Sequence, residues 1–133
     1  MNVLAPVSSI MTEMLYTVNP KDKLRAVKAI FDQHKIHHLP VVRYKKIVGI
    51  ISKIDLLSFM KGAGEEENSL RLDHYCAEDI MTKGLAKLEP DDRINVALEV
   101  FKKNLFHALP VVENEELVGI VTTYDIIAEL ANE

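Results

Sequence analysis

The chain has 133 residues, of which 48% are hydrophobic and 27% are charged, proportions typical of one soluble globular domain. No apolar run approaches the roughly 18 residues of a membrane-spanning helix, and the N-terminus lacks the charged start and apolar stretch of a secretory signal, so we expect no membrane partner. Cys76 is the only cysteine, which excludes an intrachain disulfide and favours a reducing, cytoplasmic location.

The formal net charge of −4 is distributed unequally along the chain, with opposite signs in its two halves. Residues 1–61 carry ten Lys and Arg against four Asp and Glu, or +6, whereas residues 62–133 carry six against sixteen, or −10. The basic half has neither a clustered basic run nor interleaved aromatic residues, which are features of a single-strand binder. We therefore expect no nucleic-acid partner.

Hydrophobic spacing predicts the first elements in chain order. Residues 16–18 form an extended start, and residues 21–34 have apolar side chains three to four positions apart, which predicts an amphipathic helix with Asp22 in its first turn. Two β-rich runs, 40–43 and 47–51, flank the polar sequence YKK and predict a hairpin. A second helix follows, with apolar residues at Leu56, Leu57 and Met60.

The same order returns 70 residues later without a gap. The sequences IMT, HHLPVV and VGI in the first copy match IMT, HALPVV and VGI in the second. Ungapped agreement predicts the same structure twice. We assign residues 1–61 to the first repeat, 62–77 to an acidic, glycine-containing linker and lead-in, and 78–133 to the second repeat. The glycines and acidic residues of 61–69 are expected to stay solvated and not to extend a core.

Each copy is too short and too apolar to bury its sheet and both helices alone. The predicted fold class is therefore α+β, with tandem β-α-β-β-α repeats packed about a pseudo-two-fold axis. Any apolar face left over would drive homodimerisation, and the division of charge favours head-to-tail pairing of two chains.

The sequence after each hairpin carries the chemistry. It reads GIISKID at 49–55 and GIVTTYD at 119–125, with a hydroxyl residue three positions before an aspartate. This spacing is typical of a helix capping box. It also suits a nucleotide, with phosphate at the helix N-terminus, a ribose on the carboxylate, and a glycine that allows close approach by the ligand. Both interpretations stay open on spacing alone.

The landmarks IMT, TVNP, IHHLPVV and VGIISKIDLL, with their second-copy counterparts, resemble the cystathionine β-synthase (CBS) domain pair, or Bateman module, over nearly the whole chain. The resemblance implies a stand-alone regulatory module that binds AMP, ADP, ATP or S-adenosylmethionine and often dimerises into a disc. It implies ribose binding by Asp55 and Asp125, and an adenine pocket at Val18 and Leu88. The residues that it places near phosphate are Ser52, Thr122, Thr17, Lys87, His37, His38 and His107.

The resemblance also implies that histidines reach across to the opposite copy. His37 and His38 would face the Asp125 site, and His107 the Asp55 site. Lys87 stands where the first copy has Thr17, so we expect tighter polyphosphate binding at the Asp125 site.

The histidines have two other interpretations. His34, His37 and His38 could end the first helix beside its last carbonyls. A zinc site formed by these three lacks a fourth ligand, so no metal is assigned.

No nucleophile elbow, paired carboxylates or metal-ligand spacing indicates catalysis, so we expect neither an enzyme nor a catalytic cofactor. The leading hypothesis is an adenosyl-ligand sensor that acts through the packing of repeats or subunits, with an unidentified effector protein. The alternative is a ligand-free structural or dimerisation module for a partner protein.

Overall fold

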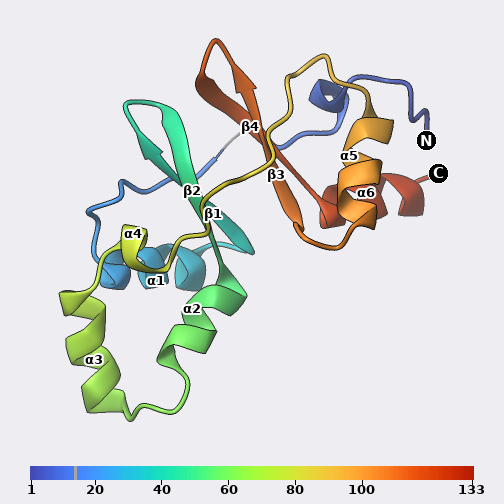
Figure 1. Ribbon diagram of the computed structural model, residues 1–133. Coiled ribbons are helices and arrows are strands. Elements are labelled where there is room, and N and C mark those ends of the chain that lie inside the picture. Colours follow the sequence, from blue (N-terminus) through green and yellow to red (C-terminus); the bar gives the residue numbers. More distant parts are fainter. Residues whose placement is uncertain (14) are drawn as a thin grey trace. The chain divides into compact units, whose positions relative to one another are not determined.

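The computed structural model describes residues 1–13 and 15–133 and divides into two compact units, each with helices and a β-hairpin (Figure 1). Residues 16–84 form the Asp55 unit, and residues 1–15 with 85–133 form the Asp125 unit. The Asp55 unit contains α1 (Leu24–Gln33), β1 (His38–Arg43), β2 (Lys46–Ser52), α2 (Lys53–Met60), α3 (Glu65–His74) and α4 (Ala77–Ile80). The Asp125 unit contains a 3-10 turn, η1 (Val7–Ser9), then α5 (Ile94–Lys102), β3 (Ala108–Glu113), β4 (Glu116–Thr122) and α6 (Thr123–Ala131).

The α+β class and the order helix, hairpin, helix in each copy are confirmed. The pseudo-two-fold packing stays a prediction.

Both predicted hairpins form, with the same register. β1 pairs antiparallel with β2 and β3 with β4, and the register shifts between Val41 and Val42 and, equivalently, between Val111 and Val112. The turn residues Tyr44 and Lys45 have φ of 51° and 67°, and Asn114 and Glu115 have 52° and 68°. Two successive positive φ values are the pattern of a type I′ turn, which matches the twist of the strands.

The first helix of each copy begins later than the spacing predicts. α1 starts at Leu24, and no acid lies in its first turn. Instead, the Asp22 carboxylate accepts a hydrogen bond from the Asn19 N–H at 2.9 Å, and Asp92 does the same for Glu89 at 2.7 Å. These acids stabilise the turn that leads into the helix, because an aspartate readily bonds a nearby backbone N–H in a turn.

Each hairpin is widened at both edges by single backbone bridges. Val18 pairs parallel with Val41, and Thr82 pairs antiparallel with Ile50 on the other edge. In the Asp125 unit the equivalent residues are Leu88 on β3 and Thr12 on β4. The predicted extended starts are thus reduced to one bridging residue in each unit.

These edge bridges explain why the units differ from the predicted boundaries. Thr12 exchanges two hydrogen bonds with Ile120, at 2.9 and 3.0 Å, so the first residues of the chain belong with the second hairpin. Thr82 does the same with Ile50, at 2.8 and 3.1 Å. The Asp55 unit therefore includes the IMT segment at 80–82, which precedes the second copy in the sequence. The Asp125 unit includes the IMT segment at 10–12, which precedes the first copy. Repeat comparison could not detect this, because the exchange leaves the offset of 70 unchanged.

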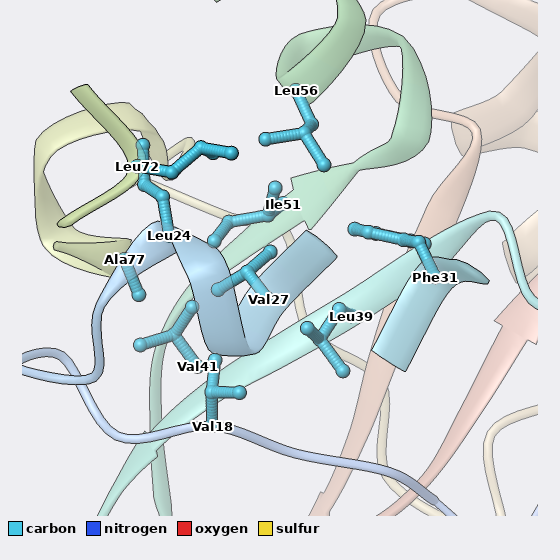
Figure 2. Close-up of a cluster of buried hydrophobic side chains, with 10 residues drawn as sticks. All are labelled: Val18, Leu24, Val27, Phe31, Leu39, Val41, Ile51, Leu56, Leu72 and Ala77. Atoms are coloured by element: carbon cyan, nitrogen blue, oxygen red, sulfur yellow. The ribbon is translucent and has the colours of Figure 1, made fainter. Parts of the chain in front are cut away.

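A separate hydrophobic cluster lies in each unit. In the Asp55 unit, Leu24, Val27 and Phe31 of α1 pack with Leu39, Val41 and Ile51 of the hairpin, as Figure 2 shows. Val18, Leu56, Leu72 and Ala77 complete it. The apolar side chains that follow the helical spacing of α1 and those that alternate along the strands thus pack into the same core.

The predicted linker is folded. Residues 65–74 form α3, and its Leu72 is only 5% exposed within the Asp55 cluster. Residues 61–69, which were expected to stay solvated, are exposed apart from the half-buried Ala63 and Asn68. Two polar residues of α3 bond the last carbonyls of α2: Arg71 bonds that of Phe59 at 2.8 Å, and Asn68 bonds that of Met60 at 3.0 Å. These bonds satisfy acceptors that a helix end leaves unpaired. A single buried leucine is too weak a hydrophobic pattern to predict from the sequence that α3 packs against the rest of the unit.

Arg25 of α1 also holds α3 in place, through a second set of hydrogen bonds. Its guanidinium donates to both carboxylate oxygens of Asp73, at 2.6 and 3.0 Å, and to the carbonyl of Ser69 at 2.9 Å. The hydrogen bond from Arg25 holds the pKa of Asp73 below its ordinary value. Because the folded pKa is the lower one, this contribution is present above the ordinary carboxyl pKa of about 4 and is lost as the pH falls further.

We therefore expect Arg25→Met to loosen α3 selectively. Amide hydrogen exchange should rise across residues 65–74 and change little in β1 and β2. Lys28→Met is the matched control, because Lys28 pairs with Asp32 inside α1 at 2.6 Å and does not hold α3. Equal exchange in the two variants would contradict the role given to Arg25.

Candidate functional site

The site residues gather where each hairpin passes into its following helix. Ser52 Oγ accepts the N–H of Asp55 at 2.9 Å, and Asp55 Oδ2 accepts the N–H of Ser52 at 3.0 Å. Thr122 and Asp125 repeat this exchange at 3.2 and 2.8 Å. Both capping boxes are therefore complete, and the capping interpretation of the two motifs is confirmed. Such a box contributes about 1 kcal/mol to helix stability without any ligand.

The boxes leave one oxygen on each carboxylate. Within residues 1–13 and 15–133, Oδ1 of Asp55 accepts no hydrogen bond, whereas Oδ1 of Asp125 lies 3.4 Å from the hydroxyl of Thr12. That distance is long for a hydroxyl hydrogen bond. Each acid thus has acceptor capacity for a further donor while its box remains intact.

The helix N-termini offer fewer free amides than an open anion site would. The N–H of Lys53, the first residue of α2, donates to the carbonyl of His37 at 2.9 Å. The third N–H of the helix, that of Asp55, is taken by Ser52. In the Asp125 unit, Thr123 donates to the carbonyl of His107 at 3.1 Å, and Thr122 takes the third N–H. In the described part of the chain, this leaves the second amide, that of Ile54 or Tyr124, for a phosphate oxygen.

Backbone pairing brings the other predicted residues to the same end of each sheet. His38 pairs directly with Ser52. Thr17 precedes Val18, which runs parallel to β1, so Thr17 lies toward the end of the sheet where Ser52 lies. Lys87 takes the same position before Leu88. Thr17, Lys87, His37 and His107 are exposed, and His38 is half-buried.

Val18 and Leu88, predicted to line an adenine pocket, lie in the cores. They are only 3% and 4% exposed, and each belongs to the hydrophobic cluster of its own unit. Their backbone groups are bonded to β1 and β3, for example Val18 N–H to the carbonyl of Pro40 at 3.1 Å. These side chains offer a ligand little surface.

His34 does close the end of α1, as its alternative interpretation predicts. Its backbone N–H donates to the carbonyl of Ile30 at 3.0 Å. Its ring stacks on Tyr16, with centroids 3.9 Å apart. Across residues 1–13 and 15–133, no group of three His, Cys, Asp or Glu side chains is placed to hold a metal ion.

The space over the two glycines is filled by methionines. A Cβ added to Gly49 would lie 2.5 Å from Sδ of Met81, and one added to Gly119 would lie 2.6 Å from Sδ of Met11. From the sequence, these glycines were expected to allow close approach by a ligand. In the structure it is the methionine of an IMT segment that lies close to each glycine. The IMT repeat was visible in the sequence, but its contact with the glycines depends on which hairpin each segment joins.

A shallow groove lies on the outer surface of α2. It encloses about 400 Å³ and is lined by Ile54, Leu57, Ser58, Met60 and Lys61. Neither Ser52 nor Asp55 lines it. No helix in the described part of the chain is both long and apolar enough to cross a lipid bilayer.

The family described as the CBS domain matches residues 7–62 and again residues 77–132. The chain belongs to the CBS domain family. Its two repeats, each with a hairpin and a capped helix, are thus a CBS pair.

This CBS pair is similar to parts of varied proteins. Inosine-5′-monophosphate dehydrogenase of Thermoplasma acidophilum is 29% identical over 90% of this chain, which spans only 22% of that enzyme. Protein MJ1225 of Methanocaldococcus jannaschii, described as a putative archaeal homolog of g-AMPK, matches with a TM-score of 0.82 and 27% identity, over 96% of this chain and 50% of that one. The CBS domain pair of protein MJ0100, solved with 5′-methylthioadenosine and S-adenosyl-L-methionine, matches with a TM-score of 0.76 and 26% identity, over 96% of both chains.

Gly49→Ala should destabilise the protein by about 1–3 kcal/mol, because the added methyl group overlaps Met81. Adding Met81→Ala should recover part of this loss. Gly119→Ala should be rescued less by Met11→Ala, because its methyl group also meets the backbone carbonyl of Thr12 at 3.2 Å. Chemical denaturation of the single and double variants measures both couplings, and a neutral Gly49→Ala would refute the packing argument.

Proposed function

We propose that this CBS pair is a regulatory module that binds an adenosyl ligand at the Asp55 and Asp125 motifs. The single observation that supports it most is the oxygen of each aspartate that remains beyond the capping box. A ribose hydroxyl can donate to that oxygen without displacing the cap. The ligands solved in the CBS pair of MJ0100, which have an adenosyl group in common, support this ligand class.

The proposed roles follow the positions of the side chains. Asp55 and Asp125 bind ribose, while the hydroxyls of Ser52 and Thr122 and the second amide of each helix bind phosphate. Thr17 and Lys87 supply further phosphate contacts from the neighbouring strand position. Adenine is read by backbone groups near Val18 and Leu88, since their side chains are buried.

We propose AMP, ADP or ATP as the ligand, with S-adenosylmethionine as the other candidate. The module binds and does not catalyse, and it signals to an effector protein when ligand changes the packing of repeats or subunits. Its single cysteine suits a reducing compartment such as the cytoplasm.

We also propose that the chain forms a homodimer. Large apolar side chains are exposed on the outer faces of the second helix of each repeat: Ile54 (74%), Leu57 (57%), Tyr124 (69%), Ile127 (61%) and Leu130 (51%). Exposed apolar surface repeated on one chain favours self-association, most often with two-fold symmetry.

The complete capping boxes favour a second candidate, a scaffold without ligand. In that case Asp55 and Asp125 would serve helix stability alone. The two functions predict the same core and differ only in ligand binding, so a ligand titration separates them.

A melting screen with AMP, ADP, ATP, S-adenosylmethionine, NAD and Mg²⁺-nucleotide should find a stabilising ligand. At a hundredfold excess over Kd the expected gain is about 2.7 kcal/mol. Asp55→Asn with Asp125→Asn should remove this gain while changing the ligand-free melting temperature little, because an amide oxygen can still accept the cap hydrogen bond. If no ligand stabilises the wild-type chain, the scaffold function is supported instead.

The two sites should differ in affinity for polyphosphate. Lys53 begins α2 and Lys87 precedes Leu88, so each unit has one lysine near its site, and the expected preference for the Asp125 site depends on His37 and His38 reaching it. In separate titrations with ATP, Asp125→Asn should lose more affinity than Asp55→Asn, and this difference should shrink in His37→Gln/His38→Gln. Equal losses in the two aspartate variants would contradict the asymmetry.

A further inference from the structure

The two IMT segments place a methionine sulfur at the closest contact with each hairpin. Outside the chain neighbours of each glycine, Sδ of Met81 is the atom nearest to a Cβ built on Gly49, and Sδ of Met11 is the atom nearest to one built on Gly119. The unbranched chain of methionine fits the flat surface that a glycine leaves. The atom that makes the contact is therefore also the one atom of the side chain that an oxidant attacks.

Both methionines lie at the rim of a core. Met81 packs against the hydrophobic cluster of the Asp55 unit and Met11 against that of the Asp125 unit, yet each is only half-buried. The threonine that follows each of them, Thr82 or Thr12, is exposed. Because oxidation depends on access, a small oxidant such as hydrogen peroxide can reach these side chains from solvent.

One bridging residue ties each IMT segment to its hairpin through the backbone. Thr82 exchanges two hydrogen bonds with Ile50, and Thr12 exchanges two with Ile120, and each pairing is an isolated bridge outside the strands. The chain passes between the units at 15–16 and at 84–85, so each bridge lies within four residues of a crossing. The methionine contact thus supports a narrow attachment, whose loss would free the segment that leads from one unit to the other.

We propose that Met11 and Met81 form a paired methionine-oxidation site, at which peroxide releases the IMT segments from the hairpin edges. One peroxide oxygen is transferred to the thioether sulfur: the O–O bond breaks, an S–O bond forms, the sulfur loses two electrons, and the other oxygen leaves as water. The sulfoxide is larger and polar, so packing it against glycine and the core is unfavourable. Methionine sulfoxide reductases restore the thioether, which makes the release reversible. The inference depends neither on a ligand nor on self-association.

Limited oxidation with hydrogen peroxide tests the site in the Cys76→Ser chain, which has no thiol to compete and keeps a residue suited to a helix N-cap. Fragmentation mass spectrometry assigns sulfoxide to each of the five methionines. After oxidation, amide hydrogen exchange should rise about tenfold at the four bridging residues, Thr82 with Ile50 and Thr12 with Ile120, and change little in α1. Treatment with the reductases for both sulfoxide epimers should return exchange to its starting value.

Each unit is the matched control for the other. Met81→Leu keeps a similar volume and cannot form a sulfoxide, so peroxide should then loosen only the bridge of the Asp125 unit, and Met11→Leu should confine the effect to the Asp55 unit. Met60→Leu, at the end of α2 away from its capping box, should respond like Cys76→Ser alone.

Three results would each overturn the proposal. The first is sulfoxide at Met60 while Met11 and Met81 stay reduced. The second is unchanged exchange at the bridges once Met11 and Met81 are oxidised. The third is faster exchange that the reductases do not reverse, which would indicate general damage. Should a leucine variant fail to fold, oxidation and repair of the Cys76→Ser chain still decide between these results and the proposal.

Discussion

A hairpin of two strands is not stable in water until its edges and one face are covered, and this constraint shapes both units. In each unit a parallel bridge covers one edge and the IMT segment covers the other. The IMT segment comes from the part of the sequence before the other copy. The methionine of that segment then requires a glycine opposite it, which accounts for Gly49 and Gly119. Unit boundaries, glycines and methionines thus follow from the need to complete a narrow sheet.

The capping boxes sit at the end of these completed sheets and explain how one aspartate can serve both stability and binding. A carboxylate has two oxygens, and the box uses only Oδ2. A ligand that bonds Oδ1 leaves the cap in place, so binding does not require the helix to give up a stabilising interaction of about 1 kcal/mol. The cap also holds the carboxylate in one position, which would lower the entropy lost by any ligand that bonded Oδ1.

The sequence predicted features that depend on local periodicity. The two hairpins, the amphipathic stripe of α1 and the boxes at Ser52 and Thr122 all appear in the structure as expected. It did not predict features that depend on long-range pairing. The burial of Leu72, the contact of Met81 with Gly49 and the core position of Val18 each require knowing which segments meet. The roles of Thr17, Lys87 and the histidines in ligand binding stay predictions, because they depend on a bound ligand and on the pairing of the two units.

Duplication makes the two copies comparable position by position, and their differences then have meaning. Grouped by unit, the Asp55 unit has twelve Lys and Arg against nine Asp and Glu, or +3, and the Asp125 unit has four against eleven, or −7. This contrast is smaller than that between the two halves of the sequence, because the acidic segment around α3 folds with the basic hairpin.

At the hairpin tips, however, the reversal of charge is complete. Other equivalent positions are reversed as well, such as Lys21 against Asp91 and Asp32 against Lys102. The core positions that hold the hairpins together, such as Val41 and Val111, are identical in the two copies. Packing has therefore constrained the inside of the two units alike, while the charges of their exposed surfaces have diverged.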